Sequence, residues 1–428
     1  MKEDFVHYMW QHMLIRNQDM STTDGSKLEV ISPGTENHDA GPDFTTARVR
    51  IDGTLWAGNV ELHVKSSYWY DHGHHKDEAY DNIILHVVYY ADKEVVKRNG
   101  SPIPHLELKN YCDPQLENRY LLLMKSKNVI PCEKLLGKVD DFTFRHWLCR
   151  LLVCRMERKA DDAIRFLQYF GNDWEQLCLF LLARYLGGKA NASTFGLLIQ
   201  RTPIEALMKN HDDLITLEAL LFGQAGLLEK SFQEPYPIKL KNEYYYLGKK
   251  YDLPERLHKR LWKYSRMRPA NFPDMRIAQL AAMIHVNQGR LFSKVLTMNA
   301  LDNICDMMRA DVNAYWRAHY RLDSKSRHNI KKMGVATWHN ILINVLVPLF
   351  FIYGKERNKA SFVEHGLDLM AKIPGEQNRI TSIWKSLGRE PANAGESQGM
   401  IELYKQYCLA RKCLKCSIGH QILKKTKS

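Results

Sequence analysis

The first 110 residues alternate between one helical pattern and several extended patterns of hydrophobic positions. Residues 3–16 carry apolar side chains at the spacing of an amphipathic helix, on a face that holds Phe5, Met9, Met13 and Ile15. Residues 27–34 predict a short strand that ends in a turn. A helix followed by strands is typical of a mixed α/β unit.

Two alternating segments follow and are joined by a two-residue turn. Residues 43–52 and residues 55–66 both alternate polar and apolar side chains, and Asp52-Gly53 lies between them. An Asp-Gly pair between two alternating segments predicts a β-hairpin.

Extended patterns continue to the end of this part. Residues 82–90 are almost continuously apolar, which is typical of a strand buried on both faces. Residues 102–109 contain two prolines and predict an edge strand. The polar residues 70–81 between the hairpin and these strands predict a short helix near their end.

The remaining pattern is helical, with apolar positions near every 3.6 residues. Residues 142–168 and 172–187 are long examples, and short loops with Gly, Asn and Pro separate the later segments. No fixed-period repeat is visible, so the helices are expected to be irregular or solenoid-like. We therefore expect an α+β multi-domain protein, with a mixed α/β domain in residues 1–112, a linker in 113–139 and an α-helical domain in 140–428.

The most apolar stretch is interrupted by polar residues and a proline. Residues 335–353 contain His339, Asn340, Asn344 and Pro348. A membrane span tolerates few such groups, so this stretch predicts a kinked core helix and no membrane. The start of the chain lacks the basic-then-apolar order of a signal peptide, and the nine cysteines are scattered. We expect a cytoplasmic protein of unspecified oligomeric state.

The net charge of +13 is unevenly distributed. Residues 1–110 hold 11 Lys and Arg against 17 Asp and Glu, whereas the rest of the chain holds the remaining 50 and 31. The first part also holds 9 of the 18 histidines. This asymmetry predicts a basic body that binds nucleic acid beside a metal-binding unit, or else a solvated basic surface. Residues 236–276 mix basic side chains with six tyrosines, as in a nucleic-acid surface or a surface connection over the core.

Three ionisable groups stand at alternate positions of one predicted strand. Glu61, His63 and Lys65 share one face of residues 55–66. Four residues along a strand span roughly 13 Å, so Glu61 and Lys65 are too far apart to act on one water molecule. Either His63 takes the place of a lysine behind Glu61, or His63 is a ligand and Lys65 keeps the lysine role.

The preceding strand begins with Pro42-Asp43, and a hairpin places Asp43 within reach of Glu61. Two carboxylates and an imidazole predict a Mg²⁺ or Mn²⁺ site of Asp43, Glu61 and His63, with His63 as third ligand or general base. Further candidate ligands are His72, His74 and His86. The alternative to a metal site is a structural charge network.

The predicted order of helix, three strands, helix and strand, with Pro42-Asp43 and an acid on the next strand, resembles the restriction-endonuclease-like nuclease superfamily. That resemblance implies two carboxylates that hold Mg²⁺ and a lysine that orients the attacking water. Residues 33–89 also resemble a bacterial family known as domain of unknown function 2851, as do the segments 172–198, 217–228, 266–282 and 407–423. This second resemblance spans nearly the whole chain and implies no activity.

The C-terminal segment carries three closely spaced cysteines. Cys408, Cys413 and Cys416 follow a C-x4-C-x2-C spacing, and His420 comes four residues later. Thiolates at this spacing predict a zinc ion or an iron–sulfur cluster. Either His420 or a distant cysteine such as Cys132 is the fourth ligand, and the alternative is reduced cysteines packed in a helical terminus.

Three functions follow from these patterns. The leading one is a metal-dependent nuclease that uses Asp43 and Glu61, with the helical domain supplying affinity for phosphates. The second is a non-enzymatic nucleic-acid-binding or scaffold protein with a structural acidic and histidine cluster. The third is a zinc hydrolase of a small molecule built from His63, His72, His74 and His86.

Overall fold

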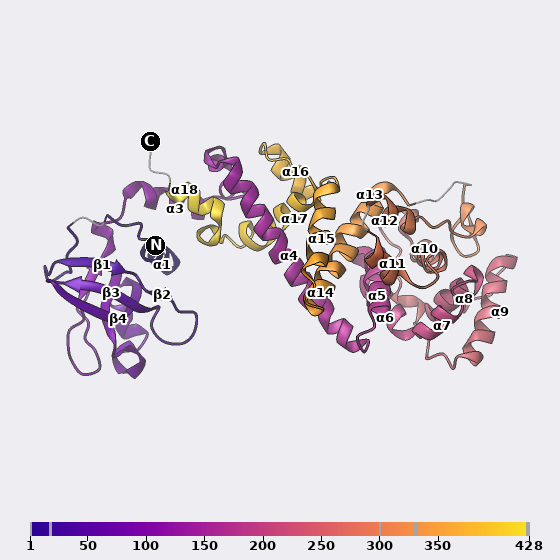
Figure 1. The fold of residues 1–428 in the computed structure, drawn as a ribbon, viewed down its shortest axis with the longest axis horizontal. Helices are drawn as coiled ribbons and strands as arrows, with labels where there is room; N and C mark the ends of the chain where they lie inside the picture. The colour runs from indigo at the N-terminus through magenta and orange to yellow at the C-terminus, as the bar shows by residue number, and fades with distance from the viewer. Residues whose placement is uncertain (1, 17–18, 299–300, 328–332, 425–428) are drawn as a thin grey trace. The chain divides into compact units, whose positions relative to one another are not determined.

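The computed structural model describes residues 2–16, 19–298, 301–327 and 333–424, and Figure 1 shows the path of the chain. The chain forms two compact units. Unit 1 comprises Met1–Trp147 and Leu403–Ser428, and unit 2 comprises Leu148–Glu402. Unit 1 is therefore built from both ends of the chain.

Unit 1 is centred on a mixed β-sheet. In spatial order its strands are β1 (Leu28–Ser32), β3 (Phe44–Ile51), β4 (Thr54–Lys65), β5 (Ile83–Tyr90) and β6 (His105–Glu107), with β2 (Thr35–Glu36) paired to β3. The β1–β3 and β3–β4 pairs are antiparallel, whereas β4–β5 and β5–β6 are parallel. The predicted hairpin is present: Asp52 and Gly53 both have positive φ angles, of 46° and 83°, as its tight turn requires.

Several helices in the described part of unit 1 accompany the sheet. They are α1 (Glu3–Gln11), α2 (Tyr68–Asp71), α3 (Pro114–Lys125) and α18 (Ser417–Lys424). Helix α1 packs against β4, and Phe5 of α1 stacks on Tyr120 of α3 with ring centroids 4.0 Å apart. Tyr8 of α1 also hydrogen-bonds His420 Nδ1 in α18 at 2.8 Å. Both ends of the chain are thus tied to the same sheet.

Helix α1 is shorter than the apolar pattern predicts. It ends at Gln11, because Met13 adopts a left-handed backbone with φ 47° and the chain turns away. Ile15 then forms a single β-bridge with Cys112. Ile15 is buried, as expected, but in this extended segment and not on a helix face.

In its described residues, unit 2 is helical apart from a small hairpin of β7 (His319–Arg321) and β8 (Ser324–Lys325). One hydrophobic core cluster runs through it, from Leu152 to Ala394. Helix α4 (Asp141–Tyr169) enters this unit from unit 1. The others are α5 (Trp174–Leu186), α6 (Gly188–Arg201), α7 (Ile204–Lys209), α8 (Leu214–Gln224), α9 (Pro235–Lys250), α10 (Pro273–Val286), α11 (Leu291–Thr297), α12 (Leu301–Met308), α13 (Val335–Ile341), α14 (Val347–Glu356), α15 (Ala360–Lys372), α16 (Arg379–Ser386) and α17 (Ala394–Glu402).

The apolar stretch predicted as a kinked core helix is helical and mostly buried. It comprises α13, a π-helical segment η8 (Leu342–Leu346) and α14, in which Pro348 lies in the first turn. Among the described residues, Val335–Glu356 is the one helical stretch long and apolar enough to cross a membrane. Two thirds (67%) of its most apolar window is buried inside the protein, as in a core helix.

Helices α4 and α17 of unit 2 touch at their backbones and share a buried ion pair. A Cβ atom on Gly399 would lie 2.5 Å from the carbonyl oxygen of Leu148, so the helices approach more closely there than any larger residue allows. Arg155 donates to Gln398 at 2.7 Å and to Glu402 at 3.1 Å, all three side chains being buried. The two ends of unit 2 are thereby fastened together.

The unit boundaries differ from those expected on the sequence. Residues 113–139, expected as a linker, contribute α3 and the short helix η4 (Glu133–Lys138) to unit 1. Residues 403–428 belong to unit 1, although the helical pattern continues into them without a break. Helix α18 packs against α3 and η4, and such contacts between distant segments leave no mark on local periodicity.

Candidate metal centre

Strand β4 carries Glu61 and His63 in the middle of the sheet, where both faces are covered. Val60, Glu61, Leu62 and His63 are all buried, because α1 and α2 pack over the face that a solvated strand would leave open. In the parallel register Glu61 pairs with His86 of β5, which pairs in turn with His105 of β6. Three ionisable side chains therefore form a row across three adjacent strands.

Asp43 and Glu61 converge at the start of the hairpin. The Asp43 backbone N–H donates to Glu61 Oε2 at 3.1 Å, and the Leu62 backbone N–H donates to Asp43 Oδ2 at 3.0 Å. These two bonds hold the carboxyl groups beside each other. The structure thus places together the two acids that the sequence singled out.

Three histidines gather in front of Glu61. His63, His72 and His74 each offer a ring nitrogen, and these atoms all lie within 4.8 Å of one another. His72 follows α2, and Gly73 adopts φ 80°, a conformation that favours glycine and turns the chain so that His74 comes back over the sheet. His74 Nε2 lies 3.2 Å from Glu61 Oε1. Three nitrogens therefore gather at one point, and the Glu61 carboxylate lies beside two of them, those of His74 and His63.

Two further histidines lie behind this group. His63 Nδ1 and His86 Nε2 are 2.8 Å apart, and the His86 and His105 rings lie side by side with centroids 5.1 Å apart. All three side chains are buried. The hydrogen bond with His86 at Nδ1 fixes the orientation of the His63 ring and leaves its Nε2 directed toward His72 and His74. Residues outside the ligand set commonly orient a metal-binding histidine in this way.

Helix α1 adds two groups that sequence reasoning missed. His7 Nε2 lies 3.2 Å from Asp43 Oδ2, and Glu3 Oε1 lies 4.0 Å from His63 Nε2. Glu3 and His7 are four residues apart and thus share a helix face. That spacing is the one sequence signal for them, and it does not reveal that α1 packs on β4.

The central imidazoles are held neutral. Burial, reinforced by the nearby rings of His74 and His72, lowers the pKa of His63 to about 3. Burial and the neighbouring His63 also lower the pKa of His86 well below its usual value. Neutral imidazole is the form that binds a metal ion, so His63 could coordinate one at neutral pH while neutral His86 stays hydrogen-bonded to it.

The pKa values of Glu61 and His7, next to these imidazoles, are raised by their surroundings. Burial raises the pKa of Glu61, against the hydrogen bond from His74, and the nearby charge of Asp43 adds to the increase. Burial alone lowers the pKa of His7, but the bond to Asp43 and the charge of Glu3 outweigh it, so the pKa of His7 is raised. A divalent cation in front of Glu61 would relieve the cost of its buried charge.

Lys65 is not brought to this group. It lies at the exposed end of β4, and its Nζ is 4.0 Å from Asp92. In the structure His63, two residues before it, stands next to Glu61 with 3.7 Å between His63 Nε2 and Glu61 Oε1. Of the two readings left open by the sequence, the geometry matches the one with His63 behind Glu61.

The donor set indicates which ions fit. Imidazoles suit Zn²⁺ and other transition ions, whereas Mg²⁺ prefers oxygen ligands. Three imidazoles and the carboxylate of Glu61 fit Zn²⁺ or Mn²⁺ better than Mg²⁺. Asp43, engaged with Leu62 and His7, is placed beside the ligands as a second carboxylate.

The His420 side chain is bonded to helix α1 and does not lie with the C-terminal cysteines. His420 Nδ1 lies 2.8 Å from the Tyr8 hydroxyl, and its ring centroid is 4.5 Å from that of His12. Burial, with the nearby charges of His12 and Lys424, lowers the pKa of His420 to about 4. Its side chain is thus engaged by α1. Cys408, Cys413 and Cys416 are buried free thiols, and Cys132 lies near them.

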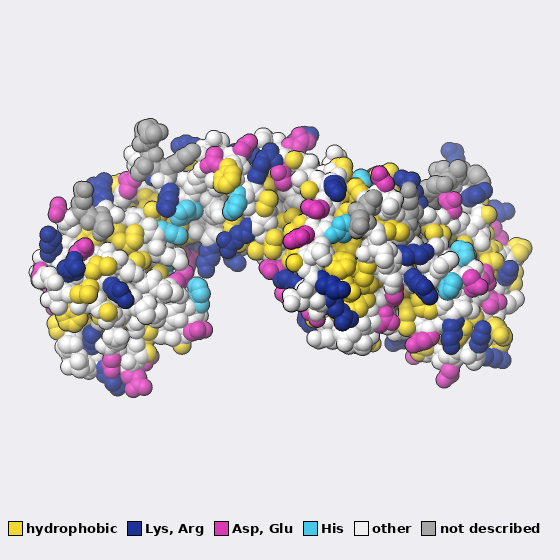
Figure 2. Space-filling view, viewed as in Figure 1, with side chains coloured by type: hydrophobic (Ala, Val, Ile, Leu, Met, Phe, Trp, Pro, Cys, Tyr) yellow, Lys and Arg dark blue, Asp and Glu magenta, His cyan; other side chains and the backbone are white. Residues whose placement is uncertain are grey.

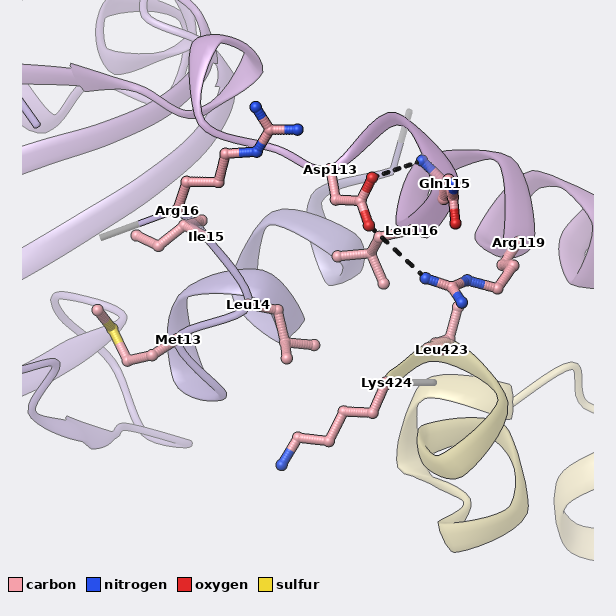
Figure 3. Close-up of a pocket in the computed structure, with 10 residues that line it drawn as sticks. All are labelled: Met13, Leu14, Ile15, Arg16, Asp113, Gln115, Leu116, Arg119, Leu423 and Lys424. Carbon is pink, nitrogen blue, oxygen red and sulfur yellow. Dashed lines mark hydrogen bonds and ion pairs between the residues drawn. The ribbon is translucent and has the colours of Figure 1, made fainter. Parts of the chain in front are cut away.

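A separate cavity of about 490 Å³ lies where residues 13–16 meet α3 and the end of α18 (Figure 3). Asp113 caps α3 through the Gln115 N–H at 2.9 Å and lies 3.8 Å from Arg119. None of the predicted metal ligands lines it. The cavity is therefore distinct from the histidine group.

A family model described as "Protein of unknown function (DUF2851)" matches residues 3–379. The chain belongs to this family. Neither the search of curated proteins nor the search of solved structures gave a match. In this DUF2851 protein the match includes the histidine centre and Cys132, while the three C-terminal cysteines lie beyond it. The predicted membership is confirmed, and the resemblance to nucleases stays a prediction.

Proposed function

We propose that unit 1 is a divalent-metal-dependent hydrolase that cleaves phosphodiester bonds in nucleic acid. The observation that carries this proposal is the group of His63, His72 and His74, whose ring nitrogens lie within 4.8 Å of one another, with Glu61 Oε1 3.2 Å from His74 Nε2. A metal ion bound there would activate a water molecule and neutralise charge on a phosphoryl group. The site lies within the sheet, which holds its groups rigidly.

Each side chain has a separate task in this proposal. Glu61 and the three histidines hold the ion, and His86 keeps His63 oriented through the bond at Nδ1. Asp43 supplies a second carboxylate next to Glu61, and the Leu62 backbone N–H holds it in place. Glu3 is half-exposed at the start of α1, and burial with the nearby charge of Asp43 raises its pKa, so it is suited to carry a proton.

Two features support nucleic acid as the substrate class. The first is the chain order of α1, β1, β2, the β3–β4 hairpin, α2 and β5, with the two acids adjacent, which supports the resemblance to a nuclease-like core. Helix α9 of unit 2 exposes Tyr245 and Tyr246, with Lys249 Nζ 4.6 Å from the Tyr245 ring. Figure 2 shows Lys and Arg side chains on the visible surface in the region of α9. Aromatic and cationic side chains together suit backbone contacts and base stacking.

Calorimetric titration of Mn²⁺ and Zn²⁺ into the metal-free full chain tests the centre. Wild type is expected to bind about one ion per chain, and Glu61→Gln and His74→Ala are expected to lose it. His38→Ala and Lys65→Ala are the matched controls, because both side chains are exposed and lie outside the group, and both should bind as wild type does. Hydrolysis of DNA and RNA is then measured with wild type and the same variants.

The Glu61→Gln variant has a second readout that does not require a substrate. Because burial disfavours the charge of Glu61, the metal-free variant should melt about 2–4 °C above metal-free wild type, the shift that ~1 kcal/mol gives in a large domain. Added metal should raise the melting temperature of wild type and leave that of the variant unchanged. A folded wild type that binds neither ion would overturn the proposal.

A zinc-dependent hydrolase of a small molecule is the second candidate. It is favoured by the number of imidazoles, since three protein ligands with an open position are typical of catalytic zinc. Zinc in the purified protein that is lost in His63→Ala, without any hydrolysis of DNA or RNA, would favour it. Nucleic-acid binding that persists in Glu61→Gln, without hydrolysis by wild type, would instead indicate a binding module.

A further inference from the structure

Four cysteines from distant parts of the chain lie at one place in unit 1. Cys132 precedes η4, Cys408 ends the π-helical segment η9 (Leu403–Cys408), Cys413 begins the short helix η10 (Cys413–Lys415), and Cys416 precedes α18. All four are buried, with 6–8% of each residue exposed, and all are free thiols.

Packing of the surrounding elements holds these segments together. Helix α18 contacts both η4 and η10, and η10 contacts η9. Gly419 of α18 lies directly on the Cys413 backbone, where a Cβ atom would come within 2.0 Å of the Cys413 carbonyl oxygen. Glycine at this position allows the turn of Cys413 to sit against the first turn of α18, next to Cys416.

The thiols are close enough to affect one another. Burial raises the pKa of Cys132 to about 12, and the charges of Cys416 and Cys413 contribute to that increase. Burial and the charges of Cys132, Cys416 and Cys413 likewise raise the pKa of Cys408. Four buried sulfurs gathered on contacting elements form a donor set for a cation.

The groups around Cys416 are suited to a thiolate. Its sulfur accepts hydrogen bonds from the backbone N–H groups of Ile418 and Gly419, in the first turn of α18, and the Trp147 side chain lies beside it. Arg411 lies near Cys408 and Cys413 and lowers the pKa of both, against their burial. Hydrogen bonds to sulfur and a nearby cation are common around thiolate-bound metal centres.

The spacing of the sulfurs distinguishes between the two kinds of centre. Tetrahedral zinc at Zn–S distances of about 2.3 Å holds its sulfurs roughly 3.8 Å apart. Within the described parts of the chain, three ligand atoms come within 4.8 Å of one another at the three histidines, and no three of these thiols do so. A cluster of iron and sulfide ions stands between its thiolates and needs them further apart than one ion does.

We propose that Cys132, Cys408, Cys413 and Cys416 bind a four-iron, four-sulfide cluster, each thiolate holding one iron. The cluster would link the C-terminal segment, which carries three of the cysteines, to Cys132 next to η4 and so join the two parts of the chain that form unit 1. His420, bonded to Tyr8, takes no part. This inference is independent of the proposed hydrolase activity, since it uses none of the ligands of the histidine centre.

Metal and sulfide analysis of the full chain, purified without oxygen or reconstituted with ferrous iron and sulfide, tests the proposal. About four iron and four acid-labile sulfide per chain are expected, with visible absorption that dithionite bleaches. Cys132→Ser and Cys413→Ser should each lose iron and sulfide. Cys112→Ser is the matched control, because Cys112 is as buried and lies in the same unit, and it should keep them.

Two results would overturn the proposal. One is wild-type protein that takes up no iron and sulfide, or that holds one zinc ion at these thiols in their place. The other is a Cys132→Ser variant that keeps the full cluster, since Cys132 is the ligand that the sequence motif does not supply. Analysis of wild type remains decisive if a variant fails to fold, and manganese binding at the histidine centre reports separately on the proposed function.

Discussion

At the scale of single residues, Glu218 of α8 is a carboxyl group buried in the core of unit 2. It accepts a hydrogen bond from Trp316 Nε1 at 2.8 Å and is bonded to the Tyr236 hydroxyl. Burial, against these two bonds, raises the pKa of Glu218 to about 7. The folded protein therefore keeps a proton on Glu218 in a pH range where the unfolded chain has released it.

This shift predicts how stability depends on pH. The folded-state pKa lies above the usual 4.5, so the free energy of unfolding falls as pH rises from about 4.5 through about 7. Glutamine mimics the protonated acid, so Glu218→Gln should match wild type at pH 4 and exceed it at pH 8 by on the order of 3 kcal/mol. Urea unfolding at the two pH values measures this. Exposed Glu205→Gln is the control, and an equal effect of Glu218→Gln at both pH values would refute the assignment.

The candidate centre shows which residues a sequence can reveal. Alternation along β4 places Glu61 and His63 on one face, and the density of histidines after it points to His72 and His74. Glu3 and His7 of α1 were missed, because their approach depends on how a helix packs on a sheet. The choice between His420 and Cys132 as partner of the C-terminal cysteines likewise depends on tertiary contacts.

At the scale of elements, the close approach of α4 and α17 depends on the absence of a side chain. Gly399 lies on the Leu148 backbone, whereas Gly248 in α9 has open space around its Cα. Both residues are helical, so both carry the intrinsic cost of glycine in a helix. The two positions differ in the space available for a Cβ atom, so they form a matched pair.

Alanine at the two positions should have opposite effects. Gly248→Ala should raise the free energy of unfolding by roughly 0.5–1 kcal/mol through the loss of unfolded-state freedom. Gly399→Ala should lower it by roughly 1–3 kcal/mol, because its Cβ would clash with the Leu148 carbonyl and separate the helices. Thermal unfolding of the two variants beside wild type measures both. A stabilising Gly399→Ala would show that α4 and α17 are less tightly packed than described.

The elements also show where local patterns suffice. The hairpin of β3 and β4, the buried β5 and the helical character of unit 2 all follow from periodicity and from Asp52-Gly53. The end of α1 does not, because a left-handed Met13 stops the helix while the apolar spacing continues. Chain order alone also gives no sign that α18 packs with α3.

At the scale of the whole molecule, charge is divided along the chain, with an acidic first part and a basic remainder. If nucleic acid binds the α9 surface, Lys249 and Lys250 contact phosphates and Tyr245 stacks on a base. Each Lys→Gln change should weaken binding and reduce the slope of log K against log salt by roughly one, and Tyr245→Ala should cost roughly 1–3 kcal/mol with no change in slope.

Fluorescence anisotropy with a labelled single-stranded oligonucleotide at several salt concentrations measures these effects. Lys355→Gln serves as the control, since Lys355 lies on α14 and is paired with Glu157 at 2.9 Å. Binding by the α9 variants that equals wild type at every salt concentration would exclude this helix as the nucleic-acid surface.

The discontinuity of unit 1 has a consequence for how the protein is made. Residues 403–428, which carry the partners of Tyr8 and of Cys132, leave the ribosome only after all of unit 2. At typical synthesis rates the 255 residues of Leu148–Glu402 take roughly 10–50 s to translate. During that time the amino-terminal sheet has no α18 to pack with. All residues of unit 2 are therefore synthesised before those of unit 1 are complete.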